Sequence, residues 1–281
     1  MLLKLFVSFL FGVVEGITEW LPVSSTGHMI LFNQFISLEK LTSKNFYSMF
    51  EVVIQLGAIM AVVVIFWHQI WPFRNNKKKQ GAERYVNMDI IRLWIKILIA
   101  CVPAAIVGVL FDELFEKLFY NPVCVAIALI VFGVAFIVVE NNHKNMRPRI
   151  NSLEEITPKT ALMIGIFQLI AAIFPGTSRS GSTIVGSLMI GVSRTVAAEF
   201  TFFLAIPVMF GASLLKIAKF GLAFTSTEAA ILAVGCIVAF VTSMLIIKFL
   251  MSYIKKHDFK VFGWYRIILG ILVLLYFYVI K

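Results

Sequence analysis

The stretch Glu15–His28, E-G-I-T-E-W-L-P-V-S-S-T-G-H, decides how the chain folds, because it places charged and polar groups inside a strongly apolar segment. It holds two carboxylates, two serines and an imidazole. A helix that faces lipid cannot carry such groups, since each charge at the centre of a bilayer costs at least a few kcal/mol. Pro22 interrupts the helix, and the small polar residues Ser24 to Gly27 favour an unwound backbone. The stretch therefore predicts a helix that is broken inside the protein.

A second stretch of the same kind is Gln168–Gly181, Q-L-I-A-A-I-F-P-G-T-S-R-S-G, which aligns with the first when Pro175 is placed on Pro22. Backbone without helical hydrogen bonds is tolerated at membrane depth only where it is buried in protein or lines a wet cavity. We therefore predict two re-entrant helix–loop–helix hairpins, at 3–31 and 160–190.

The composition is that of a polytopic membrane protein. Of 281 residues, 60% are hydrophobic and 14% are charged, against roughly a quarter charged in soluble domains. A helix that spans the bilayer core needs about 20 mainly apolar residues. Convincing runs lie near 46–67, 93–111, 121–140, 198–217, 229–250 and 262–280.

Each half of the chain, about 1–143 and about 157–281, then consists of one re-entrant hairpin and three transmembrane helices. Because three is an odd number, the second half enters the membrane in the opposite direction to the first. We predict an all-α polytopic membrane protein, a single membrane domain over 1–281, built as an inverted-topology repeat. In such folds the functional site lies near the midplane between the repeats.

Loop charge predicts the orientation. The net charge is +10, but the basic residues gather in short loops between apolar runs, which indicates the positive-inside pattern and not nucleic-acid binding. We expect the loops after the first, third and fifth spans to be cytoplasmic, both termini to be external, and an acidic external loop at 112–117. The three basic loops carry Arg74, Lys77, Lys78, Lys79 and Arg84; Lys144, Arg147, Arg149 and Lys159; and Lys255, Lys256 and Lys260.

Glu15 and Glu19 are candidate metal ligands. They are four residues apart and so share one face of a helix. Two carboxylates this close in a low-dielectric site repel, and both stay ionised only beside a cation. Oxygen ligands of this kind suit Mg²⁺ or Ca²⁺ bridging to a phosphate. The alternative is that both side chains are solvated at the membrane edge.

The tip of the first hairpin carries candidate phosphate-binding and catalytic residues. Ser24, Ser25, Thr26 and Gly27 place hydroxyls and backbone N–H groups at the start of the returning helix, which favours phosphate. Ser25 is a candidate nucleophile, and His28, one turn further on, is a candidate base or acid. The alternative is that the serines only cap a helix and that His28 is an interfacial histidine.

The second hairpin supplies a cation, Arg179, within P-G-T-S-R-S-G-S-T at Pro175–Thr183. An arginine buried in a membrane needs an anionic partner, and its planar fork matches phosphate oxygens. The hydroxyls that would complete a phosphate cradle belong to Ser178, Ser180 and Thr183. The alternative is a structural ion pair with Glu15 or Glu19, which is compatible with phosphate binding because it would form in the resting state.

Other polar and aromatic residues receive structural interpretations. We expect Gln168 to be a buried hydrogen-bonding residue, Arg266 to lie at a solvated boundary, and Trp20 to belong to an aromatic belt at the membrane surface. Glu51 and Glu199 head apolar spans and would either orient the hairpins or pair with Arg194 or Arg179.

The motifs Glu15–His28 and Pro175–Thr183 closely resemble those of the bacterial undecaprenyl-diphosphate phosphatases of the bacitracin-resistance type. The resemblance implies hydrolysis of undecaprenyl diphosphate to undecaprenyl phosphate and inorganic phosphate at the external face of the bacterial plasma membrane, which recycles the lipid carrier of peptidoglycan synthesis. It also implies dependence on Mg²⁺ or Ca²⁺. By motif position, the functional residues are Glu15, Glu19, Ser25, His28 and Arg179.

The resemblance and the motifs together lead to a hypothesis for the mechanism. The phosphates are neutralised by Arg179, a divalent cation and the hairpin N–H groups. Ser25 or a water attacks the terminal phosphorus, and His28 or a glutamate handles the proton. The sequence leaves open whether a phosphoserine forms, which prenyl chain length and metal are preferred, and whether the protein is a homodimer. The rival class is a transporter or flippase of a phosphorylated lipid, because inverted repeats with broken helices are typical of secondary transporters.

Overall fold

A computed structural model of the chain describes residues 1–74, 84–119, 121–143, 147–221 and 223–280, and these residues are almost entirely helical. Besides helices they contain two isolated β-bridges, Phe73–Val86 and Ile150–Val192. The helices are α1 Leu2–Thr18, α2 Ser25–Phe35, α3 Leu38–Leu41, α4 Lys44–Val53, α5 Gln55–Ile65, α6 Trp67–Ile70, α7 Met88–Phe119, α8 Pro122–His143, α9 Pro158–Ile173, α10 Arg179–Met189, α11 Arg194–Phe220, α12 Ser226–Ile254 and α13 Lys260–Leu275, followed by a π-helix at Tyr276–Ile280.

In the part of the chain that the structure describes, six apolar helical segments are long enough to cross a membrane, and the six predicted spans are confirmed. The first is built from α4 and α5, which run on through Ile54 in a right-handed helical conformation. The segments are Lys44–Ile65, Met88–Gly108, Pro122–Asn142, Arg194–Phe220, Ser226–Ile254 and Lys260–Tyr278. The chain is therefore an all-α, multi-pass membrane protein.

The predicted acidic loop at 112–117 is wrong, because α7 continues through this segment to Phe119. The sequence F-D-E-L-F-E-K-L-F contains no Gly or Pro, and Leu, Glu and Lys favour a helix. The helix ends just before Pro122, which begins α8. The side chains of Asp112, Glu113 and Glu116 lie outside the described residues.

Two helix pairs, α1–α2 and α9–α10, are broken where the sequence places its polar motifs. The second helix of each pair begins after a serine with positive φ, 74° at Ser24 and 72° at Ser178. Each serine hydroxyl accepts a hydrogen bond from the backbone N–H of a glycine three residues on, Gly27 or Gly181. These caps start α2 at Ser25, so the predicted unwound stretch at Ser24 to Gly27 lies earlier, between α1 and Ser24.

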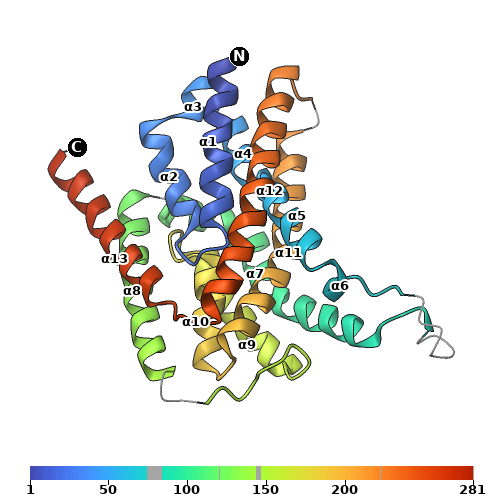
Figure 1. Cartoon of the computed structure of the whole chain (residues 1–281). Coiled ribbons are helices and arrows are strands. Elements are labelled where there is room, and N and C mark those ends of the chain that lie inside the picture. Colours follow the sequence, from blue (N-terminus) through green and yellow to red (C-terminus); the bar gives the residue numbers. More distant parts are fainter. Residues whose placement is uncertain (75–83, 120, 144–146, 222, 281) are drawn as a thin grey trace.

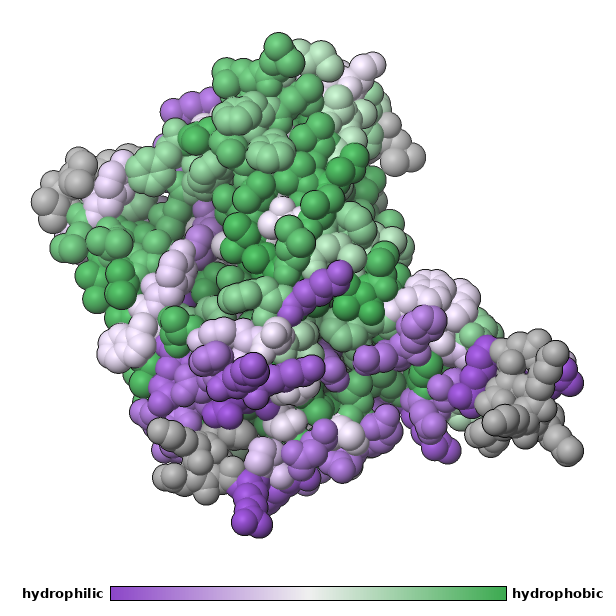
Figure 2. All heavy atoms as spheres, in the orientation of Figure 1, coloured by the Kyte–Doolittle hydropathy of each residue, from purple (hydrophilic) through white to green (hydrophobic). Residues whose placement is uncertain are grey.

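Figure 1 shows how the two broken pairs meet. The α1–α2 pair lies in the upper half of the molecule and α9–α10 in the lower half, with their breaks facing each other at mid-height. Both termini lie in the upper part, whereas the C-terminal ends of α8 and α12 and the starts of α9 and α13 lie in the lower part. Figure 2 shows hydrophobic atoms over most of the upper face and hydrophilic atoms gathered at the lower end.

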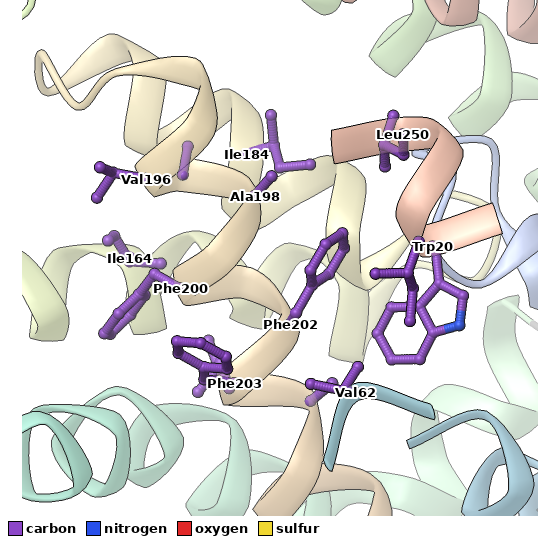
Figure 3. Close-up of a cluster of buried hydrophobic side chains, with 14 of the residues drawn as sticks. Trp20, Val62, Ile164, Ile184, Val196, Ala198, Phe200, Phe202, Phe203 and Leu250 are labelled. Carbon is purple, nitrogen blue, oxygen red and sulfur yellow. The ribbon is translucent and has the colours of Figure 1, made fainter. Parts of the chain in front are cut away.

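The main core packs around the breaks. Trp20 is fully buried, and its ring meets Phe202 of α11 edge-on with a centroid distance of 5.2 Å; Figure 3 shows both rings beside Leu250 of α12. The prediction that Trp20 joins an aromatic belt is therefore wrong. Because the chain leaves α1 one residue before Trp20, the indole turns into the protein and not toward the membrane surface.

Candidate active site

The tips of the two broken pairs are joined by a charged cluster. Nη2 of Arg179 lies 2.9 Å from Oε1 of Glu19. The hydroxyl of Ser25 donates a hydrogen bond of 2.5 Å to the other carboxylate oxygen, Oε2. Glu19 and Ser25 are almost fully buried, with 5% and 7% of their surface exposed. The structural ion pair considered from the sequence is thus present, and it includes the candidate nucleophile.

Local structure explains why these three residues converge. Glu19 is the C-cap of α1, while Ser25 and Arg179 are the first residues of α2 and α10. The first turn of a helix has unpaired N–H groups and a positive dipole end, which favour anions. The starts of two 11-residue helices therefore flank the same carboxylate. The arrangement stabilises negative charge, from Glu19 or from a phosphate that reaches the cluster.

Arg266 of α13 joins the breaks of the α1–α2 and α9–α10 pairs through hydrogen bonds. It is fully buried, and its guanidinium donates hydrogen bonds to the carbonyl of Pro22 at 3.0 Å, of Gly176 at 2.8 Å and of Thr177 at 2.7 Å. The prediction of a solvated boundary is therefore wrong. The surrounding sequence, G-W-Y-R-I-I-L-G, could have indicated burial, because a charge inside an apolar span needs partners within the protein.

His28 is held away from Ser25. Its Nδ1 lies 2.7 Å from the carbonyl oxygen of Ser24, and its Nε2 lies 2.7 Å from the hydroxyl of Tyr265 on α13. A carbonyl only accepts, so Nδ1 donates, and in the neutral ring Nε2 then accepts from Tyr265. No hydrogen bond within the described chain joins His28 to Ser25.

The remaining predicted phosphate-binding residues fall into three groups. Ser24, Gly27 and Ser178 are used in helix capping. The hydroxyl of Ser180 donates to the backbone carbonyl of Glu19 at 3.1 Å and so joins the cluster. The hydroxyl of Thr183 lies 2.9 Å from the carbonyl of Arg179 and 2.9 Å from the hydroxyl of Thr201, and Thr26 lines a cavity.

Two cavities lie near the cluster, of which only the larger is lined by a cluster residue, Arg179, and they share Val52, Ala171, Ala172 and Lys216. The smaller, about 220 Å³, is lined by polar residues that include Glu15, Thr26 and Glu51. The larger, about 990 Å³, is lined by Arg179, Gln168 and mainly apolar residues of α7 and α11. A smaller chamber with several polar residues, which we call the polar chamber, therefore lies next to a larger, mainly apolar one.

Comparison with known proteins decides the family. The model of the family described as bacitracin resistance protein BacA matches residues 8–272. The chain belongs to the BacA family. It is 61% identical over 276 residues to an undecaprenyl-diphosphatase of Desulfitobacterium hafniense, covering 98% of this chain and 97% of the relative. It is 61% identical to undecaprenyl-diphosphatase 1 of Clostridium acetobutylicum, covering 96% of each chain, and 58% identical to an undecaprenyl-diphosphatase of Enterococcus faecalis, covering 94% of each.

For this BacA-family chain, the two candidate metal ligands have different surroundings. Glu15 is 1% exposed, lines the smaller cavity, and its Oε1 has no hydrogen-bond partner among the described residues. Both oxygens of Glu19 are used by Arg179 and Ser25. Among the described residues, no group of three or more His, Cys, Asp or Glu gathers around one point. Glu15 fits a cation that takes its other ligands from a phosphate or water, whereas both carboxylate oxygens of Glu19 already have partners.

Proposed function

We propose that this protein is an integral membrane phosphatase that hydrolyses undecaprenyl diphosphate to undecaprenyl phosphate and inorganic phosphate, and that it thereby confers bacitracin resistance. Relatives that match nearly the whole chain are named undecaprenyl-diphosphatases. The observation that carries the proposal in the structure is the cluster of Arg179, Glu19 and Ser25 beside one polar and one apolar cavity.

The two cavities match the two parts of a prenyl diphosphate. The larger cavity has apolar walls from α7 and α11, and these suit a section of the isoprenoid tail. The polar chamber and the starts of α2 and α10 suit the diphosphate. Arg179 would neutralise phosphate charge, and the backbone N–H groups at the helix starts would stabilise the charge that develops in phosphoryl transfer.

Ser25 would act as the nucleophile and Glu19 as its base. The short hydrogen bond from Ser25 to Oε2 of Glu19 points the serine proton at a carboxylate that can accept it. The Ser25 oxygen would then attack the terminal phosphorus, with the prenyl monophosphate as leaving group, which would take the proton from Glu19. A water would next hydrolyse the phosphoserine, releasing inorganic phosphate and restoring the Ser25 hydroxyl. His28 would hold the first hairpin tip through Ser24 and Tyr265, and proton transfer to Ser25 would not pass through it.

A divalent cation, Mg²⁺ or Ca²⁺, would be held by Glu15, and when bound it would offset phosphate charge. Two carboxylates, of Glu15 and Glu51, and one ammonium group, of Lys216, line the smaller cavity, so a divalent cation would offset the remaining negative charge when an anionic headgroup enters. Glu19 would remain with Arg179 and Ser25.

One assay tests the function. Purified protein in detergent, without a membrane separating two compartments, should release inorganic phosphate from a prenyl diphosphate, and Arg179→Ala should abolish the release. A transporter or flippase would release none. If circular dichroism shows that Arg179→Ala keeps its secondary structure, the loss of phosphate release is not caused by unfolding.

The proposed architecture is an inverted-topology repeat of about 1–143 and about 157–281 within one membrane domain. Helix contacts support it, because α1 packs on α12 as α9 packs on α7, and α4–α5 packs on α11. The third spans, α8 and α13, pack on each other with a matching pair of close approaches. A Cβ on Gly133 would lie 2.7 Å from the carbonyl of Gly263, and one on Gly270 would lie 2.7 Å from that of Ala126.

We place the protein in the bacterial plasma membrane with the basic end in the cytoplasm and the site opening to the external face. Described basic residues of the third and fifth loops adjoin the lower ends of α8, α9, α12 and α13 in Figure 1. Lys77, Lys78, Lys79 and Lys144 lie outside the described residues. In intact cells, Lys255→Cys in a cysteine-free background should resist a membrane-impermeant thiol reagent and Ser37→Cys should react. The reverse labelling pattern would invert the orientation.

A further inference from the structure

Gln168 of α9 is buried but has no internal hydrogen bond, contrary to the prediction made from the sequence. Only 2% of its surface is exposed, and within the described chain neither Oε1 nor Nε2 has a hydrogen-bond partner. A buried amide left unpaired costs folding free energy, and a ligand that pairs with it is one explanation for its retention. Gln168 lines the larger cavity, where a ligand would meet it.

A second unpaired donor lines the same cavity. Arg179 uses Nη1 on the carbonyl of Thr201 and Nη2 on Glu19, both at 2.9 Å. Its Nε is buried without a partner among the described residues. Gln168 and Arg179, each with a buried unpaired N–H donor, therefore line one cavity. An anion with several acceptor oxygens satisfies both, and phosphate is such an anion.

The position of Gln168 selects which phosphate it would bind. Ala171 and Ala172, which line both cavities, follow Gln168 by about one helical turn. Gln168 therefore lines the larger cavity about one helical turn from the part of α9 that borders both cavities. A phosphate held there would be attached to a chain lying in the apolar chamber, which makes it the phosphate that stays on the lipid.

We infer that Gln168 is a substrate-binding residue whose amide donates a hydrogen bond to the prenyl-linked phosphate. The inference rests on the proposed function and deepens it, since it separates the phosphate that remains on the lipid from the one that leaves. Arg179, which lines the same cavity, contributes its Nε to the same phosphate. The Oε1 atom of Gln168 accepts from water bound to that headgroup.

The test uses the product-like ligand geranylgeranyl phosphate, with geranylgeraniol as the headgroup-free control, titrated into the detergent-solubilised protein. Gln168→Leu removes both amide atoms and should weaken binding of the phosphate roughly tenfold to a hundredfold, with binding of the alcohol unchanged. Its unfolding midpoint should stay equal or rise, because the replaced amide makes no internal hydrogen bond. Gln168→Glu, nearly isosteric, should weaken phosphate binding at least as much, since it places like charge beside the anion.

Ser243→Ala is the matched control. Ser243 of α12 is also fully buried with an unpaired hydroxyl among the described residues, but it lines neither cavity. Its removal should leave binding of both ligands unchanged. Unaltered phosphate binding in Gln168→Leu and Gln168→Glu, or a lowered unfolding midpoint with equal loss of alcohol binding, would overturn the inference. Absence of phosphate release from the wild-type protein would instead refute the proposed function, because the binding measurement does not depend on turnover.

Discussion

Replacing Arg266 by leucine should destabilise the protein, because it removes the hydrogen bonds that join the breaks of the two helix pairs. The guanidinium donates to three buried carbonyls, of Pro22, Gly176 and Thr177. All three belong to backbone between helices, so no helical N–H is available to replace the lost donor. Each buried acceptor left unpaired costs about 1–3 kcal/mol. Some relaxation is expected, and we predict a loss of at least about 3 kcal/mol in the free energy of unfolding, a large share of a typical total of about 5–15 kcal/mol.

The assay is chemical unfolding in mixed micelles, with phosphate release measured on the same preparations. Arg266→Lys should recover part of the stability but little activity, because an ammonium group cannot reproduce the planar fork that reaches carbonyls of both tips. Arg92→Leu is the control, since its ion pair with Asp89 is largely exposed, and such pairs contribute about 0–1 kcal/mol. Unfolding of Arg266→Leu within about 0.5 kcal/mol of the wild type would refute the reasoning, because conservative estimates of the lost hydrogen bonds exceed that value.

Three further predictions follow from the site and the packing. Ser25→Ala should lose phosphate release and the labelled phosphoprotein that the wild type forms when quenched during turnover; turnover close to normal would eliminate the covalent route. Tyr265→Phe removes the hydroxyl that meets Nε2 of His28 and should lower kcat a fewfold with the unfolding free energy changed by less than about 1 kcal/mol, whereas a large loss of stability would mean that the pair is structural. Gly133→Ala should destabilise by about 1–3 kcal/mol, because its Cβ would lie 2.7 Å from the carbonyl of Gly263; Gly108→Ala, with nothing within 4 Å of its Cβ, serves as the control and should show no such loss.

Much of the architecture was predictable from the sequence for a simple physical reason. Apolar runs of about 20 residues have few alternatives to spanning a bilayer, and all six expected runs are helices of that length. The breaks were predictable as well, since Pro22 and the serines near it interrupt a helix that lipid would otherwise keep intact. The end of α7 was not predictable. The charges at 112–117 resemble a loop, but the residues there favour a helix and α7 continues to Phe119.

The contacts of individual polar side chains were much less predictable. Four-residue spacing places Glu15 and Glu19 on one face of α1, but Glu19 is the C-cap, where the chain turns toward Arg179 and Ser25. Spacing likewise puts His28 one turn from Ser25, yet the ring is held by Tyr265, 237 residues further along the chain.

The sequence by itself determined the membrane class, the six spans, the two broken hairpins and the motifs that identify the family, because these depend on local composition and on the cost of polar groups in lipid. Only the tertiary structure decided that Arg266 joins both tips, that Glu15 faces a cavity while Glu19 does not, and that Gln168 is buried without an internal partner. Most of these features arise where the breaks of the α1–α2 and α9–α10 pairs meet each other and Arg266 of α13. Partners between distant segments are set by how the helices pack, and a single sequence carries no record of that packing.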